Sequence, residues 1–234
     1  MFSKIIQYIY PPRCISCSVL VQEGNGFCGE CWKKLSFITH PYCEICSFEF
    51  SINTGLESNV CLKCMSSKPD YDAVRVPLKF DNASQKIIHA FKYYDTTHIA
   101  KIFAKIMCTS YKDFICDSDL IIPVPMHKWK RLTRLYNPPQ LLAHEIAKTY
   151  NITMMPALLK KIKNTKSQTT LSKNQRLNNI NGSIIVTNPE YIKDKNIIIV
   201  DDVMTTGATI SVCAKQLKKA GANSVRALCM ARTC

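Results

Sequence analysis

The sequence of 234 residues lacks the long apolar runs of a membrane protein. None of its runs approaches the roughly 18 residues that a membrane-spanning helix needs, so we expect no membrane insertion. The N-terminal stretch MFSKIIQYIY meets Pro11-Pro12 and has no small-residue cleavage site, which argues against a signal peptide. With 47% apolar residues, the chain has enough material for a core. These observations predict a folded, soluble protein of the cytoplasm.

Acidic residues are also in short supply. The chain has 31 lysines and arginines against 17 aspartates and glutamates, a formal net charge of +14. Residues 127–176 hold eleven of the basic residues with Glu145 as their one acid, so a net charge of +10 falls in that segment. Residues 1–68 carry a net charge of +1. A basic block of this kind is typical of contact with phosphates, in a polyphosphate substrate or in nucleic acid.

What the sequence has in excess is cysteine. Eight of its 13 cysteines form four CxxC pairs within the first 64 residues, an order that indicates metal binding rather than disulfides. Two CxxC knuckles complete a tetrahedral zinc site, so we expect two structural Zn²⁺ ions. The simplest pairing joins neighbouring knuckles, although the spacing also allows an interleaved one. The neighbouring pairing gives Cys14, Cys17, Cys28 and Cys31 for one ion and Cys43, Cys46, Cys61 and Cys64 for the other.

Closed four-cysteine sites leave no coordination position for water, so this module should stabilise the fold without doing chemistry. Eight thiolates and two Zn²⁺ ions bring its net charge to roughly −3, which disfavours phosphate binding by the module as a whole. Lys33 and Lys34 are its one candidate basic patch. The metal spacing stops before Ser66–Asp72, which predicts a double zinc ribbon at residues 1–68 and a second domain at residues 69–234.

From residue 73 the sequence alternates short aliphatic runs with amphipathic stretches of helical period. Strands are expected at 73–80 (an edge strand, because it contains Pro77), 119–125, 182–187, 196–202 and 224–232. Helices are expected at 84–94, capped by Asn82 or Ser84, and at 97–111, 138–150 and 208–221. Residues 163–181 are polar and basic, typical of an exposed mobile segment or an irregular hairpin. The alternation predicts an α/β fold with a mainly parallel sheet covered on both faces.

The stretch IIIVDDVMTTGATI, Ile197–Ile210, indicates a binding site. In a parallel α/β sheet, ligands bind beyond the carboxyl ends of the strands, where Asp201 and Asp202 fall. The turn that follows would form an anion nest at a helix N-terminus, from backbone amides, threonine hydroxyls and the positive φ that glycine allows. Its residues are Thr205, Thr206, Gly207, Ala208 and Thr209. Two acids beside an anion site fit a ligand with a diol and a phosphate, such as a ribose 5-phosphate.

Two other interpretations of this stretch explain less of it. A Walker B strand, which binds Mg²⁺ in nucleotidases, requires a GxxxxGK[ST] loop, and the sequence has none. An acidic N-cap of an ordinary helix accounts for one aspartate but not for the threonine–glycine turn. The ribose-phosphate interpretation uses both aspartates and the turn.

The same stretch closely resembles the phosphoribosyl-pyrophosphate (PRPP) signature of type I phosphoribosyltransferases. The whole chain resembles the ComF (ComFC) family, competence-associated phosphoribosyltransferase-like proteins with an N-terminal double zinc ribbon. Further matches are IIPVPMHKWKRLTRLYN (121–137) and TKSQTTLSKNQRLNNINGS (165–183). The resemblance implies a type I phosphoribosyltransferase fold behind the zinc module, and PRPP as ligand.

Carried over residue by residue, the resemblance implies that Asp201 and Asp202 hold the ribose hydroxyls and that the turn from Thr205 to Thr209 holds the 5-phosphate. Val124 and Pro125 would belong to the loop on the pyrophosphate side. Arg131, Arg134 and Asn137 would belong to the loop that closes over the substrate. The chain departs from the family pattern at Pro138-Pro139 and at Leu135, where the family has glycine. Because leucine does not readily adopt positive φ, turnover depends on whether loop closure needs that glycine.

The chemistry of PRPP then suggests roles for the basic residues. Departure of pyrophosphate leaves oxocarbenium character at C1 of the ribose, so the protein must orient the substrate and stabilise charge on the leaving group. Mg²⁺ would arrive with the pyrophosphate. Lys128, Arg131 and Arg134 are the candidate catalytic residues, and arginine is suited to bidentate phosphate contacts. No residue identifies the acceptor nucleophile.

Three functions remain open from the sequence. The first is an active phosphoribosyltransferase, and the second is a non-catalytic PRPP sensor or scaffold in DNA uptake. For the second, the basic segment with Trp129, Tyr136 and Tyr150 would bind single-stranded DNA, and the family resemblance implies a competence helicase as partner. The third is a zinc-ribbon interaction module with a vestigial α/β domain. The oligomeric state is not indicated.

Overall fold

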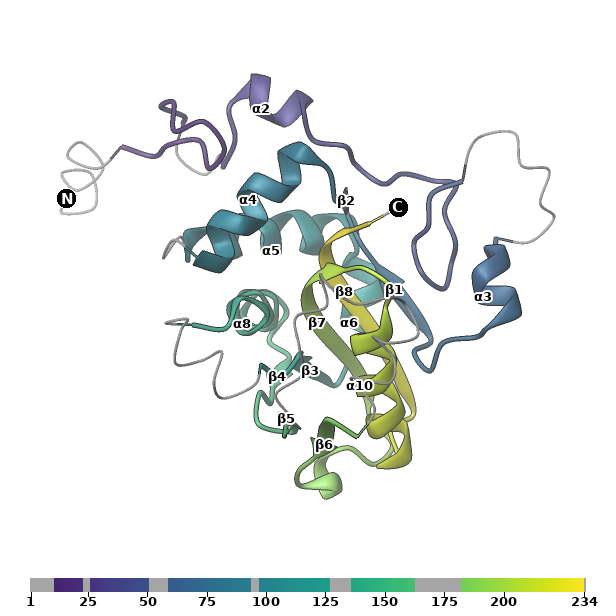
Figure 1. Ribbon diagram of the computed structural model, residues 1–234. Coiled ribbons are helices and arrows are strands. Elements are labelled where there is room, and N and C mark those ends of the chain that lie inside the picture. Colours follow the sequence, from purple (N-terminus) through teal and green to yellow (C-terminus); the bar gives the residue numbers. More distant parts are fainter. Residues whose placement is uncertain are drawn as a thin grey trace.

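The molecule is built around one parallel sheet. A computed structural model describes residues 11–22, 26–50, 59–93, 97–126, 136–162 and 182–233 (Figure 1). The strand order is β1-β8-β7-β3-β4, and β2 extends the β1 edge by pairing with β8, all in parallel. The strands are β1 (Ala73–Arg75), β2 (Leu78–Lys79), β3 (Leu120–Pro123), β4 (Thr153–Met154), β7 (Asn196–Met204) and β8 (Ser224–Arg232). The predicted α/β class with a mainly parallel sheet is confirmed.

Helices cover both faces of this sheet (Figure 1). Three long helices pack on one face, with the short α6 after the second, and one long helix packs on the other. Because successive strand residues point to opposite faces, a strand covered on both sides needs an unbroken aliphatic run, which Ile197–Val200 supplies. The helices on the first face are α4 (Asn82–Tyr93), α5 (His98–Ser110), α6 (Lys112–Cys116) and α8 (Pro138–Tyr150), and the helix on the second is α10 (Ala208–Lys219).

The start of α4 differs from the sequence-based prediction, since Asp81 caps it rather than Asn82 or Ser84. The Asp81 carboxylate accepts hydrogen bonds from the backbone N–H groups of Ala83 (3.0 Å) and Ser84 (2.9 Å). Ser84 Oγ in turn accepts a hydrogen bond from the Asp81 backbone N–H at 2.9 Å. This reciprocal cap satisfies amides at the helix start that would otherwise lack partners.

The strand expected at 182–187 lies outside the main sheet. It is β6 (Ile184–Val186), which pairs antiparallel with β5 (Leu159–Lys161), a strand that the sequence did not predict. Residues 163–181, predicted to be a mobile segment or an irregular hairpin, lie outside the described residues. A 3-10 turn, η2 (Pro189–Tyr191), leads from β6 toward β7.

The N-terminal module wraps around the β1–β2 edge of the sheet. Its two short helices are α2 (Gly29–Lys33) and α3 (Leu62–Ser66). Between them, Phe37 forms an antiparallel bridge with Leu78, and backbone hydrogen bonds join Ile38 N–H to Pro77 O (2.8 Å) and Lys79 N–H to Ser36 O (2.9 Å). This segment occupies hydrogen-bonding groups of an edge strand that would otherwise be open to other chains.

The two cysteine clusters of the module pack on opposite faces of the sheet. Cys14 and Cys31 belong to the same buried core as α4, α5 and α8. All four cysteines of the second cluster belong to the core under α10. The module therefore contributes to the hydrophobic core on both sides. The predicted domain boundary at residues 68 and 69 stays a prediction.

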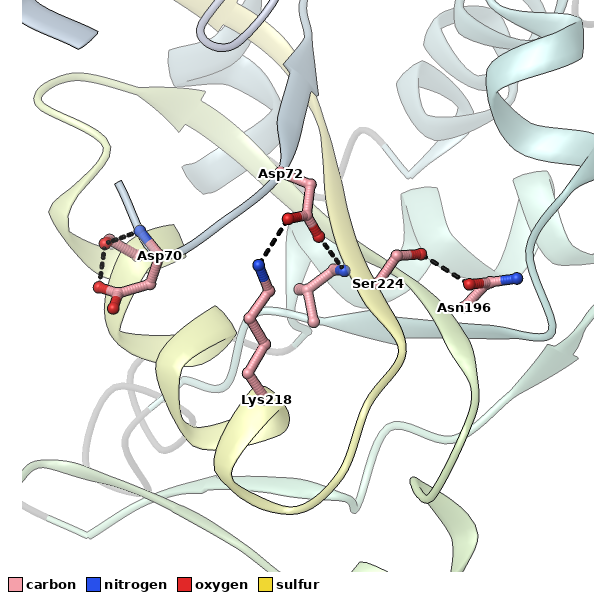
Figure 2. A network of polar contacts seen from close by, with 7 residues as sticks. Asp70, Asp72, Asn196, Lys218 and Ser224 are labelled. Atoms are coloured by element: carbon pink, nitrogen blue, oxygen red, sulfur yellow. Dashed lines mark hydrogen bonds and ion pairs between the residues drawn. The ribbon is translucent and has the colours of Figure 1, made fainter. Parts of the chain in front are cut away.

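Polar contacts attach the segment that follows the module to α10 and to the start of β8 (Figure 2). Ser211 Oγ donates to Asp70 Oδ2 at 2.6 Å and accepts from the Asp70 backbone N–H at 3.1 Å. Asp72 pairs with Lys218 and accepts from the Val225 N–H at 2.7 Å. Asp70 and Asp72 thus fix both ends of α10 relative to the module.

Candidate functional site

The two candidate diol-binding acids lie near the carboxyl end of β7, between β8 and β3. The strand does not end at Asp202 as predicted but continues to Met204, because its pairing with β8 runs on to Met204 and Arg232. Asp201 and Asp202 are successive strand residues, so their side chains leave opposite faces of the sheet. Asp202 meets α4, while Asp201 lies on the α10 side.

Burial sets the protonation of Asp201. Burial, together with the neighbouring charge of Asp202, raises the pKa of Asp201 to about 7. A hydrogen bond from the Asp202 backbone N–H to Asp201 Oδ1 (2.9 Å) and the charges of Lys92 and Lys161 act in the opposite direction. Near neutral pH the pair therefore carries less than its full charge of two, which lessens its repulsion of a bound phosphate.

Lys92 is a site residue that the sequence analysis missed. Its Nζ lies 3.0 Å from Asp202 Oδ1, and the two side chains are only 23% and 13% exposed. A partly desolvated ion pair of this kind holds the carboxylate in one orientation. The signal was present in the sequence, because Lys92 follows the buried Ile88 by four residues and so lies near the sheet-facing side of α4.

The threonine–glycine turn joins β7 to α10 as predicted. Gly207 is the residue before the helix and has φ +79° and ψ 3°, a left-handed conformation that side chains disfavour. A Cβ at this position would lie 2.9 Å from Met204 Cε and 3.1 Å from the Tyr71 hydroxyl. Ala208 N–H donates to Thr206 Oγ1 at 3.4 Å. The first-turn amides of α10 and the helix dipole favour an anion here.

The end of β3 lies beside the acids. Pro123 is in register with Val200, and Val124 N–H donates to Val200 O at 2.8 Å. Asn137, immediately before α8, donates from Nδ2 to Val124 O at 3.4 Å. The structure thus brings the candidate residues Val124, Pro125 and Asn137 to the same edge of the sheet as Asp201.

A cavity of about 550 Å³ opens at this edge. Its walls are the segment after β3, the first turn of α8, and β5 with the residues flanking it. Lys160 and Lys161 of β5 supply positive charge, Asn137 and Gln140 supply amides, and Pro125 and Met126 are among its apolar residues. A polar ligand of the size of a sugar phosphate fits such a volume.

The cysteines form two separate groups of four. In each group all four Sγ atoms lie within 4.8 Å of one another, and the groups join neighbouring knuckles. The Cys17–Cys28 and Cys46–Cys61 Sγ pairs are both 3.7 Å apart. Sulfurs held by Zn–S bonds of about 2.3 Å at tetrahedral angles are about 3.8 Å apart, so the donor set fits zinc. The neighbouring pairing is confirmed, and the interleaved alternative is wrong.

Known proteins share this combination of parts. A double zinc ribbon domain matches residues 5–65, and a phosphoribosyl transferase domain matches residues 141–233. The chain is 27% identical over 228 residues to Competence protein F of Haemophilus influenzae, across 94% of this chain and 96% of that protein. The chain is a homologue of the ComF competence proteins. This ComF homologue is also 23% identical over 222 residues to Competence protein ComFC of Bacillus subtilis, across 92% and 87% of the two chains.

A further relative is named for its role with DNA. Over 229 residues the ComF homologue is 22% identical to DNA utilization protein YhgH of Escherichia coli strain K12, across 95% of this chain and 98% of that protein. The matches confirm the predicted family resemblance and the phosphoribosyltransferase fold behind a zinc ribbon. The phosphoribosyl transferase match contains Asp201, Asp202 and the whole turn to Thr209.

The candidate catalytic residues of the ComF homologue, Lys128, Arg131 and Arg134, lie outside the described residues, as does Leu135. The first described residue after that loop is Tyr136, whose hydroxyl donates to Phe91 O next to Lys92. The C-terminal end of the loop is therefore attached to the helix that carries the Asp202 ion pair. Among the described helices, none is long and apolar enough to cross a membrane.

Proposed function

We propose that the chain binds PRPP together with Mg²⁺ at the carboxyl edge of β7. The observation that carries this proposal is the placement of Asp201 and Asp202 directly before a left-handed glycine turn at the N-terminus of α10. Carboxylates accept hydrogen bonds from a diol, and a helix N-terminus accepts a phosphate. A ribose 5-phosphate carries both groups at one end of PRPP.

Each part of the ligand has residues suited to it. Asp201 and Asp202 take the ribose hydroxyls, and the turn from Thr205 to Thr209 takes the 5-phosphate. Val124, Pro125 and Asn137 lie on the pyrophosphate side, where Mg²⁺ enters with its waters. Lys128, Arg131 and Arg134 act on the leaving pyrophosphate. These assignments put the pyrophosphate end of the ligand toward the cavity lined by Pro125, Asn137 and Lys161.

The activity that best fits this site is phosphoribosyl transfer. Its chemistry requires orientation of C1 and stabilisation of negative charge on pyrophosphate, and it requires no covalent nucleophile from the protein. Relatives named competence and DNA utilization proteins support a role in DNA uptake. A PRPP sensor without turnover is the alternative, and the same residues would bind its ligand.

Calorimetry tests the binding proposal. The zinc-loaded chain should bind PRPP in the presence of Mg²⁺, and Asp201→Asn with Asp202→Asn should abolish the heat of binding. Asp194→Asn is the matched control, because Asp194 is an exposed acid just before the amino end of the same strand, and it should bind normally. A lack of binding by the unmutated chain would overturn the proposal. Release of pyrophosphate with a panel of nucleobases then separates an enzyme from a sensor.

Single-stranded DNA binding is a second candidate function, favoured by the net charge of +10 on residues 127–176 and by the DNA utilization relatives. Such binding should weaken steeply with salt, because bound phosphates release counterions. Charge reversal at Lys128, Lys130 and Arg131 should weaken it further. If the affinity for DNA does not change with salt concentration, or if no DNA binds, this function is excluded. The proposed partnership with a competence helicase at this surface is then excluded as well.

A further inference from the structure

A lysine of the zinc module reaches the phosphate turn. Lys63 lies between Cys61 and Cys64 in α3, and its Nζ donates a hydrogen bond to Thr206 O at 3.4 Å. The two residues are 143 positions apart in the sequence. Thr206 is the central residue of the turn from Thr205 to Gly207, so this ammonium group lies beside the amides assigned to the 5-phosphate.

Several contacts attach the segments around α3 to this turn, to β8 and to α10. A Cβ on Gly207 would lie 3.1 Å from the Tyr71 hydroxyl, so Tyr71 packs against the turn. Tyr71 is only 4% exposed. Arg232, at the end of β8, donates from Nη1 to Cys46 O and reaches Cys46 Sγ at 3.4 Å. The hydrogen bonds between Asp70 and Ser211 attach the segment after α3 to the first turn of α10 (Figure 2). These contacts hold the backbone around α3 near the turn, and the exposed Lys63 side chain adds its own hydrogen bond to Thr206 O.

The cysteine cluster itself does not require a lysine at this place. In the first cysteine cluster the corresponding residue, between Cys28 and Cys31, is Glu30. Glu30 forms an exposed ion pair with Lys33 at 3.3 Å, a contact worth little in water. Within the described ranges no carboxylate pairs with Lys63, so its charge is available to a ligand.

The turn lacks a cation of its own. The stretch from Asp201 to Ile210 contains two acids and neither lysine nor arginine. We propose that Lys63 is a binding residue for the 5-phosphate, supplied to the turn by the second zinc cluster. This inference rests on the proposed PRPP function and adds a residue to it. Because the ammonium group is exposed, salt weakens its attraction for a phosphate. At low salt this attraction should still increase the affinity for the 5-phosphate.

The test compares ligands with and without a 5-phosphate. Lys63→Gln should raise the Kd of the zinc-loaded chain for ribose 5-phosphate and for PRPP with Mg²⁺ by about fivefold to tenfold at low salt. The Kd for magnesium pyrophosphate should not change, because that group binds at the opposite end of the site. Lys63→Arg should keep most of the affinity, and Glu30→Gln, at the matching position of the first cluster, should leave it unchanged.

The possible outcomes distinguish the role of Lys63 from the proposed binding of PRPP. Zinc content, measured by a colorimetric chelator after denaturation, shows whether each variant keeps both clusters. If Lys63→Gln keeps its zinc and binds ribose 5-phosphate like the unmutated chain, Lys63 has no such role while PRPP binding stands. An equal loss for pyrophosphate and ribose 5-phosphate would also overturn the inference, since it would indicate a general disturbance. Absence of binding by the unmutated chain would overturn both proposals together.

Discussion

At the scale of the residue, Asp201 is a partly exposed acid whose pKa is raised mainly by desolvation. It lies at the centre of the sheet beside Cys229 on β8, with which it is in register. Burial raises the pKa of the Cys229 thiol as well, so an ionised group between these two strands has little contact with water. A ligand whose hydroxyls donate to Asp201 supplies the missing hydrogen bonds.

Asp201 should therefore make stability depend on pH. Because its folded pKa of about 7 lies above the ordinary value of 3.8, the folded state holds a proton that the unfolded state has lost between these values, and stability falls as pH rises through that window. Asp201→Asn should remove this loss. Its free energy of unfolding relative to the unmutated chain should rise by roughly 2 kcal/mol between pH 5 and pH 8.

Urea unfolding at the two pH values measures this difference. Asp194→Asn serves as the comparison at an exposed acid, and its effect should be the same at both pH values. A constant difference between Asp201→Asn and the unmutated chain across this range would show that Asp201 titrates like an ordinary surface carboxyl.

Lys92 should matter for binding through Asp202. Replacement by methionine removes the ion pair of Asp202 and a charge that lowers the pKa of Asp201, so Asp201 is protonated more often at neutral pH and the Kd for PRPP rises about tenfold. Raising the pH to 8.5 should restore part of the affinity, and Lys92→Arg should restore most of it. Lys86→Met, at an exposed position of the same helix, is the control. A loss that does not vary with pH would assign Lys92 a structural role alone.

At the scale of the element, the sequence predicted those features that depend on contacts between residues close together in the chain. The aliphatic run of β7, the two prolines at the start of α8 and the glycine turn before α10 each depend on neighbours a few residues away. Spacing also predicted the two cysteine clusters, because a CxxC turn points both thiolates at one metal.

Long-range contacts set the features that the sequence could not predict. The contact of Lys63 with Thr206 and the pairing of β5 with β6 join residues far apart along the chain. Helical spacing placed Lys92 near the sheet, but its partner Asp202 is 110 residues away and could not be predicted from it. The extension of β7 beyond Asp202 depends on its partner β8. No property of the local sequence distinguishes Lys63 from the many other lysines of this basic chain.

The two glycines at the ends of α10 offer a test of the turn. Gly207 (φ +79°) precedes the helix and Gly221 (φ +94°) follows it, so alanine should cost about 1 to 2 kcal/mol of unfolding free energy at either place. Gly207→Ala should also weaken PRPP binding, since its Cβ approaches Tyr71 and displaces the turn. Gly221→Ala has only ordinary contacts with Lys193 and should bind normally. If calorimetry gives both variants the same affinity for PRPP, the turn does not bind the phosphate.

At the scale of the whole molecule, the two metal clusters differ in their protection. All four cysteines of the second cluster are buried, whereas Cys17 of the first is exposed and Cys28 is half-buried. A chelator reaches a ligand only where solvent does, so zinc should leave the full chain in two phases. The fast phase belongs to the first cluster, and the slow phase requires opening of the core under α10.

Stopped-flow release into a coloured chelator measures these phases. Cys17→Ser should remove the fast phase and leave the slow one, and mild destabilisation by urea should accelerate mainly the slow phase. Release of both ions at one rate would show that the clusters open together, with the segment that joins them over the sheet edge.

The position of β8 in the sheet has a consequence for synthesis of the chain. This strand is made after every other strand of the sheet, yet it lies between β1 and β7 and carries Arg232 to the second cluster. A growing chain that has already exposed the N-terminal module and β1 must keep them apart from β7 until residues 224–232 leave the ribosome. Zinc binding to the early knuckles would protect their thiols during that interval. Completion of the sheet around β8, and of the contact between Arg232 and the second cluster, then comes last.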